Sequence, residues 1–243
     1  MGKCNYININ RECYDAFADV YQARYNAGET AKHLVRIIKD ALEKEIGGHN
    51  YRILELGCGT GNILEKFKEL QEKSSDECTY SLCAIDFSKN MIAHTKEKCP
   101  DIEVYNVDVL TLSNDISSLP CEKKEKFDFV MMVALIHLFP RKDAEKLLNN
   151  IKGWLKPNGL IYIDTTDEIE FKDGEMVDKQ GKMTDEKGNT ILISKKRLRT
   201  SWTEKSFEEF LNSCGFEIIK DYSANHKTRR RKTWLQRIVK MKG

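Results

Sequence analysis

Alternate glycines mark the segment of the sequence best suited to hold a ligand. Residues 53–62 read Ile-Leu-Glu-Leu-Gly-Cys-Gly-Thr-Gly-Asn, with glycines at Gly57, Gly59 and Gly61. Glycine accepts a positive φ and lets a ligand lie directly on the backbone. The apolar run before the glycines predicts a strand, and open α/β sheets bind ligands at the carboxyl ends of their strands. The segment therefore predicts a ligand-binding loop, with the carboxylate of Glu55 beside it.

Two further carboxylates end predicted strands. Residues 81–85 predict a strand that ends at Asp86, and residues 102–107 predict a strand that ends at Asp108. A carboxylate in such a place can accept two hydrogen bonds from the vicinal hydroxyls of a ribose. A dinucleotide fingerprint would read G-x-G-x-x-G, whereas the third glycine here comes one residue early. The spacing disfavours a dinucleotide dehydrogenase, which is the competitor at the level of the fold.

The run E-L-G-C-G-T-G closely resembles motif I of the class I S-adenosylmethionine-dependent methyltransferases, of the small-molecule type. The resemblance covers about residues 50–165 and extends more loosely to the C-terminus. It implies S-adenosylmethionine as methyl donor, S-adenosylhomocysteine as product and no metal. It also implies a Rossmann-like, doubly wound α/β fold with a seven-stranded, mostly parallel sheet and an antiparallel last strand. The donor-binding residues it implies are Glu55, Gly57, Cys58, Gly59, Gly61, Asp86, Phe87, Met91, Asp108, Val109, Val133, Tyr14, Tyr21 and Arg24.

The resemblance gives individual roles to the residues at the strand ends. Asp86 would accept hydrogen bonds from the ribose, and Phe87 and Met91 would pack near the adenine. Asp108 would accept from the exocyclic amine of the adenine, and the backbone amide of Val109 would reach a ring nitrogen. A simpler interpretation of Asp86 is a negative charge at the N-terminus of the next helix, which the helix dipole favours.

Aromatic residues recur on the predicted N-terminal helices. In related small-molecule enzymes, such helices close over the donor. The faces of Tyr14 and Tyr21 could stabilise the sulfonium, and a tyrosine hydroxyl or Arg24 could bind the methionyl carboxylate. The alternative is an amphipathic helix whose aromatic side chains anchor it to the core.

The fourth predicted strand, residues 127–133, leads into the candidate catalytic residue. In the family the end of this strand, here Val133, lies under the methyl group, and the following residues face the acceptor. The run Ala-Leu-Ile-His at 134–137 departs from the N-P-P-F/Y motif of enzymes that methylate DNA bases or protein glutamine. His137 can act as a general base near neutral pH, or it can simply shape the pocket.

The predicted elements place these residues in one domain with additions. Residues 11–46 predict two helices, and we expect residues 1–48 to form a helical cap on a donor-binding domain at 49–243. Ser88 and Thr203 predict helix N-caps, and Pro157-Asn158-Gly159 predicts a turn before a strand at 160–163. Polar turn signals predict a hairpin insertion at about 167–200, with one strand at 190–194. The last strands are predicted at 216–221 and 234–239.

The preferred function is methylation of a nitrogen or oxygen atom of a small molecule. The insertion and the N-terminal helices would then form a lid over an acceptor pocket lined by Tyr162, Phe171, Met176, Met183 and Trp202. The stretch 133–137 is also similar to methyltransferases of tRNA wobble-uridine side chains. The basic clusters 195–199 and 227–232 could contact RNA phosphates, or could be solvated. A non-catalytic module that activates a partner is a further alternative.

Composition sets broad limits on the protein. The chain has 243 residues and a formal net charge of +2, which provides no general attraction to nucleic acid or to anionic membranes. The longest apolar stretch is too short to span a bilayer, and no signal-peptide core is evident. Eight cysteines without metal-site spacing predict free thiols in a reducing compartment. We expect a cytosolic monomer or homodimer.

Overall fold

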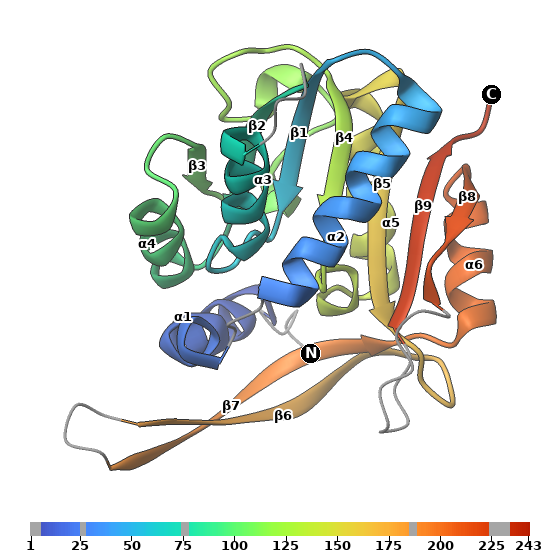
Figure 1. Ribbon diagram of the computed structural model, residues 1–243. Helices are drawn as coiled ribbons and strands as arrows, with labels where there is room; N and C mark the ends of the chain where they lie inside the picture. The colour runs from blue at the N-terminus through green and yellow to red at the C-terminus, as the bar shows by residue number, and fades with distance from the viewer. Residues whose placement is uncertain (1–5, 25–27, 74–77, 185–188, 224–233) are drawn as a thin grey trace.

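The computed structural model describes residues 6–24, 28–73, 78–184, 189–223 and 234–243. Seven strands form one sheet in the order β3-β2-β1-β4-β5-β9-β8, in which β9 runs antiparallel to both of its neighbours (Figure 1). This confirms the predicted doubly wound, mostly parallel sheet. The strands are β1 (Asn50–Leu56), β2 (Thr79–Asp86), β3 (Glu103–Asn106), β4 (Phe127–Met132), β5 (Leu155–Thr166), β8 (Phe216–Asp221) and β9 (Trp234–Met241).

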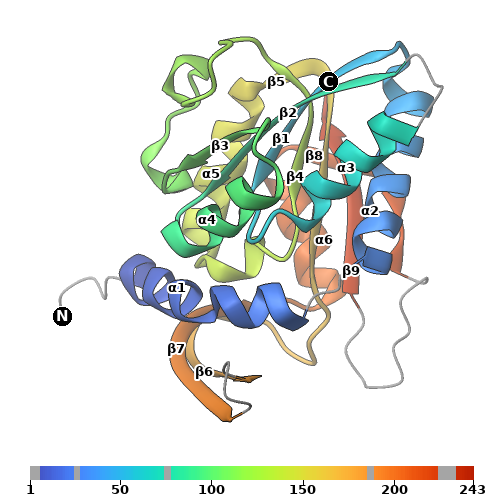
Figure 2. The same ribbon diagram turned by 60° about the vertical axis from the view of Figure 1, so that its left-hand side comes forward.

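Helices cover both faces of this sheet. α2, α3 and α4 pack on one face, and α5 and α6 pack on the other (Figures 1 and 2). Within the described residues, no helix is long and apolar enough to cross a membrane. The helices are α1 (Tyr6–Arg24), α2 (Gly28–Ala41), α3 (Asn62–Lys73), α4 (Lys89–Lys98), α5 (Arg141–Trp154) and α6 (Glu204–Ser213).

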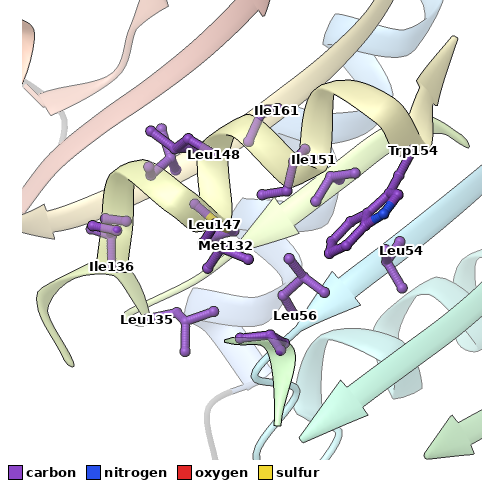
Figure 3. Close-up of a cluster of buried hydrophobic side chains, with 14 of the residues drawn as sticks. Leu54, Leu56, Met132, Leu135, Ile136, Leu147, Leu148, Ile151, Trp154 and Ile161 are labelled. Atoms are coloured by element: carbon purple, nitrogen blue, oxygen red, sulfur yellow. The ribbon is translucent and has the colours of Figure 1, made fainter. Parts of the chain in front are cut away.

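The largest part of the core lies between α5 and the sheet. Leu147, Ile151 and Trp154 of α5 point toward Leu54 of β1 and Met132 of β4 (Figure 3). Every residue of β4 is buried. A strand covered on both faces is apolar along most of its length, which explains why this segment predicted a strand so clearly, and its one charged residue, Asp128, is paired with Lys156. The core holds the carboxyl ends of the strands in fixed relative positions.

The insertion forms a long two-stranded hairpin of β6 (Lys172–Thr184) and β7 (Thr190–Ser201). It confirms the predicted hairpin, although β7 runs seven residues beyond the strand predicted to end at residue 194. The hairpin lies with α1 across the carboxyl ends of the parallel strands (Figures 1 and 2). Gly181 permits this packing, because a Cβ there would come within 2.5 Å of the Phe17 ring. We call α1 and the β6–β7 hairpin the roof.

Two local predictions at helix starts are confirmed, and one at a turn is wrong. The side chains of Ser88 and Thr203 accept hydrogen bonds from backbone amides of α4 and α6. The turn predicted at Pro157-Asn158-Gly159 does not form, because β5 runs continuously from Leu155 through these residues. The extra residues are accommodated by a shift in register against β4, where Phe127 pairs with Leu155 and Phe129 with Leu160.

The prediction that all cysteines are free is wrong for one pair. Cys83 on β2 and Cys121 before β4 form a disulfide, with Cα atoms 6.5 Å apart. They are 38 residues apart in the sequence, so no local spacing predicts that they pair. Both residues belong to the core cluster that α5 covers, and packing in this cluster brings the two sulfurs together. Five described cysteines remain as thiols: Cys13, Cys58, Cys78, Cys99 and Cys214.

Candidate functional site

A cavity of about 490 Å³ lies between the carboxyl edge of the sheet and the roof. Its volume falls within the usual range of ligand sites, about 300–1,000 Å³. Of the predicted site residues, Gly61 does not line it, and the side chain of Arg24 lies outside the described residues. Those that line it are Tyr14, Tyr21, Glu55, Gly57, Cys58, Gly59, Asp86, Phe87, Met91, Asp108, Val109, Val133 and His137.

The glycine loop has the backbone geometry that its sequence predicted. Gly57, Gly59 and Gly61 have φ values of 73°, 55° and 75°, which glycine adopts without steric cost. A Cβ on Gly57 would approach Leu135 to 2.9 Å, and one on Gly61 would approach Thr95 to 2.8 Å. A Cβ on Gly59 would meet nothing within 4 Å, so the cavity is open above this residue. The loop therefore exposes backbone at Gly59 while its flanking glycines pack tightly.

Asp86 ties the end of β2 to the glycine loop. One carboxylate oxygen accepts from the backbone N–H of Gly59 at 2.9 Å, and the other accepts from Ser88 at 2.9 Å. Burial raises the pKa of Asp86 to about 6, although these two donors oppose the shift. A carboxylate has about four lone-pair sites, so Asp86 retains acceptor capacity toward the cavity.

Glu55 places a second buried carboxylate in the cavity wall. It is 2% exposed, and its Oε2 atom has no hydrogen-bond partner among the described residues. Burial raises the pKa of Glu55 to about 8, and the nearby negative charge of Asp86 adds to the shift. A buried carboxylate with a raised pKa is strongly stabilised by a cation placed against it. Glu55 therefore fits a ligand that carries an ammonium group.

The ends of β2 and β3 are also held together. Asn106 donates its side-chain N–H to the carbonyl of Asp86 at 3.0 Å. Asp108 accepts from the backbone of Leu110 at 3.0 Å and caps a short helical turn that starts at Val109. It lines the cavity, but part of its hydrogen-bonding capacity is used by its own backbone.

The aromatic residues of α1 that line the cavity contact cations of the hairpin. The hydroxyl of Tyr14 accepts from Nη1 of Arg197 at 2.6 Å, and the hydroxyl of Tyr21 accepts from Nζ of Lys179 at 2.8 Å. The Lys179 ammonium also lies 5.4, 5.2 and 4.8 Å from the ring centres of Tyr14, Phe17 and Tyr21. These rings already face a cation of the protein itself. Their hydroxyls join α1 to the hairpin.

The loop after β4 forms the opposite wall of the cavity. Val133 lines the cavity, and Ala134 adopts a φ of 51°, which is unusual for a residue other than glycine. Its backbone N–H donates to Oδ1 of Asp164 at 2.6 Å, which holds this conformation. His137 follows on a short helical turn and is 4% exposed. The loop that leads to the candidate base is thus tied to the end of β5.

Several cavity residues escaped the sequence analysis. Asp164 had a usable signal, because it ends a predicted strand just as Asp86 and Asp108 do. Gln236 on β9 carried no signal. Arg197 and Arg199 belong to the basic cluster 195–199, for which exposure to solvent was one interpretation. Only Lys195 and Lys196 of this cluster are exposed. The additional polar cavity residues include Asn10, Asp164, Thr166, Lys179, Arg197, Arg199 and Gln236.

The five residues expected to line an acceptor pocket do not line this cavity. Trp202 is fully buried against Phe207 and Phe210. Phe171, just before β6, and Met176 on β6 are exposed, and Met183 packs on α1. Tyr162 is buried behind Asp164. The apolar residues chosen from the sequence therefore gave a wrong prediction of the pocket lining, because a strand side chain can point to either face of the strand. The cluster at 227–232 lies outside the described residues.

The residues present fit S-adenosylmethionine. Asp86 retains acceptor capacity for ribose hydroxyls, and the open backbone at Gly59 admits a ligand against the loop. The unpaired oxygen of Glu55 suits the methionyl ammonium. A glycine loop after β1 and acidic residues at the ends of β2 and β3, on a seven-stranded sheet with one antiparallel strand, define a class I methyltransferase fold.

Comparisons with known proteins agree with this class. A family model described as a methyltransferase domain matches residues 53–159. The tRNA N(3)-methylcytidine methyltransferase trm141 of Schizosaccharomyces pombe is 27% identical over 69% of this chain and 64% of that protein. The malonyl-[acyl-carrier protein] O-methyltransferase of Bacillus anthracis is 26% identical over 68% of this chain and 53% of that protein. The chain thus spans just over half to two thirds of these two relatives.

A solved structure extends the similarity to the whole fold. The DhpI complex with S-adenosylhomocysteine (SAH) aligns with a TM-score of 0.64 at 17% identity, covering 99% of this chain and 98% of that one. Residues 53–159 thus match a methyltransferase domain, and the chain as a whole has the fold of solved S-adenosylmethionine-dependent methyltransferases.

Proposed function

We propose that this protein transfers the methyl group of S-adenosylmethionine to a nitrogen or oxygen atom of a small molecule. The observation that carries the proposal is that one cavity joins two sets of residues. Those at the ends of β1, β2 and β3 suit the donor, and those after β4 and at the ends of β5 and β9 suit an acceptor. The roof closes over both, and such an enclosed space fits a small acceptor better than a polymer.

Catalysis would consist chiefly of positioning. Methyl transfer from a sulfonium is an in-line displacement, and holding the reacting atoms in line supplies much of the rate enhancement. Glu55 would hold the methionyl ammonium of the donor and Asp86 its ribose, with Val133 beneath the methyl group. His137 would take a proton from the acceptor where the acceptor is protonated at neutral pH. His137 is buried and lines the same cavity as Val133, which supports this role.

A tRNA acceptor is the second candidate. It is favoured by the yeast relative, which is named as a tRNA methyltransferase, and by exposed Lys195 and Lys196 on the hairpin. It is disfavoured by the inward position of Arg197 and Arg199, which removes half of that cluster's cations from a phosphate footprint. A nucleic-acid partner would also show affinity that falls steeply with salt.

Methyl-labelled S-adenosylmethionine separates these candidates. The protein is incubated with the label and either a small-molecule metabolite fraction or total tRNA, beside an Asp86→Ala variant as control. We expect label in small molecules with wild type, none in tRNA, and little with the variant. Label in tRNA would replace the proposal with the second candidate. Label in neither fraction, despite donor binding, would point to the non-catalytic module.

A further inference from the structure

A polar cluster at the ends of β5 and β9 borders the acceptor side of the cavity. Asp164 and Gln236 are paired across the two strands, and both line the cavity. They are 2% and 4% exposed. Tyr162 lies between them. Its hydroxyl donates to Oδ2 of Asp164 at 2.9 Å and accepts from Nε2 of Gln236 at 2.7 Å.

The direction of these bonds leaves an acceptor atom without a donor. Tyr162 has one hydroxyl proton, and the carboxylate of Asp164 takes it, so Gln236 must present its amide nitrogen to Tyr162. Its Oε1 atom is then directed elsewhere, and it is buried with no hydrogen-bond partner among the described residues. A buried polar atom left unpaired destabilises the protein. A ligand that brings a donor would recover this cost.

The topology places this cluster away from the donor residues. The glycine loop, Asp86 and Asp108 follow β1, β2 and β3, which form one half of the sheet. β5 and β9 lie on the other side of β4, and His137 follows β4 between the two halves. Asp164 and Gln236 are therefore on the side that an acceptor would occupy.

We propose that Asp164 and Gln236 bind the N–H groups of an amine acceptor. The inference rests on the proposed function and narrows it to N-methylation. An ammonium group carries three N–H donors and a positive charge, so it can donate to both oxygens at once. A hydroxyl carries one donor, and a carboxylate carries none at neutral pH. The two hydrogen-bond acceptors thus select an amine over the isosteric alcohol or acid.

The charge of Asp164 supports the same choice. Burial raises the pKa of Asp164 to about 7, although Ala134 and Tyr162 donate to it. A cation against a buried carboxylate stabilises its ionised form. In the reaction the bound ammonium first loses one proton, for which His137 is the proposed base. The nitrogen lone pair then forms the bond to the methyl carbon, and the electrons of the broken carbon–sulfur bond remain on sulfur.

The test uses three matched probes on the full chain loaded with SAH. Benzylamine, benzyl alcohol and benzoate are titrated by ligand-observed NMR against wild type, Asp164→Asn and Gln236→Leu. Asp178→Asn and Gln180→Leu, on the exposed side of the hairpin, are matched controls. Because hydrogen bonds to charged groups are worth about 1.5–3 kcal/mol, we expect wild type to prefer benzylamine by at least about tenfold. The preference should disappear in both site variants and persist in both controls.

Three results would overturn the inference. They are equal binding of the three probes, no binding of benzylamine, and a preference that survives both site variants. A tenfold loss of affinity for SAH in Asp164→Asn would also overturn it, because it would assign the carboxylate to the donor. Failure of wild type to bind SAH at all would instead count against the proposed function, so the two failures are distinguishable.

Discussion

The carboxylate of Asp86 and the backbone amide of Gly59 lie 2.9 Å apart and join the end of β2 to the glycine loop of β1. This contact orders the loop before any ligand binds. The same carboxylate faces the cavity, where it can accept hydrogen bonds from a ribose. The residue therefore shapes the loop, and we propose that it also binds the donor.

Replacing Asp86 with alanine should weaken binding of SAH by about 10- to 100-fold. The reason is the loss of hydrogen bonds to a charged group, worth about 1.5–3 kcal/mol. Calorimetric titration measures the affinity, and Asp115→Ala, at an exposed turn, is the control. Unchanged affinity in Asp86→Ala would remove this residue from the donor site.

The stability of the ligand-free protein should fall as pH rises, and Glu55 should account for much of this fall. The pKa of Glu55 is about 8 in the folded protein, against about 4.3 when unfolded. A group whose folded pKa is raised stabilises the fold fully below its unfolded pKa and loses this contribution as pH rises through the folded value. Asp86 and Asp164 act in the same direction at lower pH.

Thermal unfolding between about pH 5 and pH 9 tests this linkage. We expect Glu55→Gln to flatten the upper part of the curve, because the amide does not ionise. Glu122→Gln, at an exposed position, should leave the curve unchanged. Stability curves that run parallel for wild type and Glu55→Gln would contradict this prediction, because they would show that the fold does not disfavour ionisation of Glu55.

Replacing Asn10 with alanine should loosen the roof. The Asn10 amide donates to the carbonyl of Leu138 at 3.2 Å and accepts from the backbone N–H of Leu198 at 2.7 Å. The variant leaves two buried backbone groups unpaired, so we expect a loss of about 1–3 kcal/mol in the free energy of unfolding and faster hydrogen exchange in α1. Chemical denaturation and exchange measure these effects. Asn8→Ala, exposed on the same helix, should cost less than about 0.5 kcal/mol.

Replacing His137 with glutamine should lower the rate of methyl transfer by about 10²- to 10⁴-fold, the usual contribution of a general base. Affinity for SAH should change little, because a base acts on the acceptor. Single-turnover rates with the acceptor found in the labelling experiment measure the effect. His49→Gln, at an exposed position, is the control. A rate within about threefold of wild type would leave His137 a role in shape alone.

The donor half of the cavity was accessible from sequence because it is built from local signals. The glycines of the loop and the carboxylates at the ends of β2 and β3 each lie next to the strand that positions them. Parallel strands of one sheet bring their carboxyl ends to the same edge. A correct order of elements was therefore enough to place Glu55, Asp86 and Asp108 together.

The acceptor half depended on tertiary structure. Asp164 and Gln236 are 72 positions apart in the numbering and meet because β9 returns antiparallel beside β5. Arg197 and Lys179 face the cavity because the hairpin lies against α1, and the disulfide of Cys83 likewise joins residues with no local relation. The amino-acid sequence by itself determined the fold class, the donor loop and the strand-end carboxylates, since periodicity and glycine spacing act over a few residues. Only the tertiary structure decided which side chains enclose the acceptor, because long-range packing sets the direction in which a strand or hairpin side chain points.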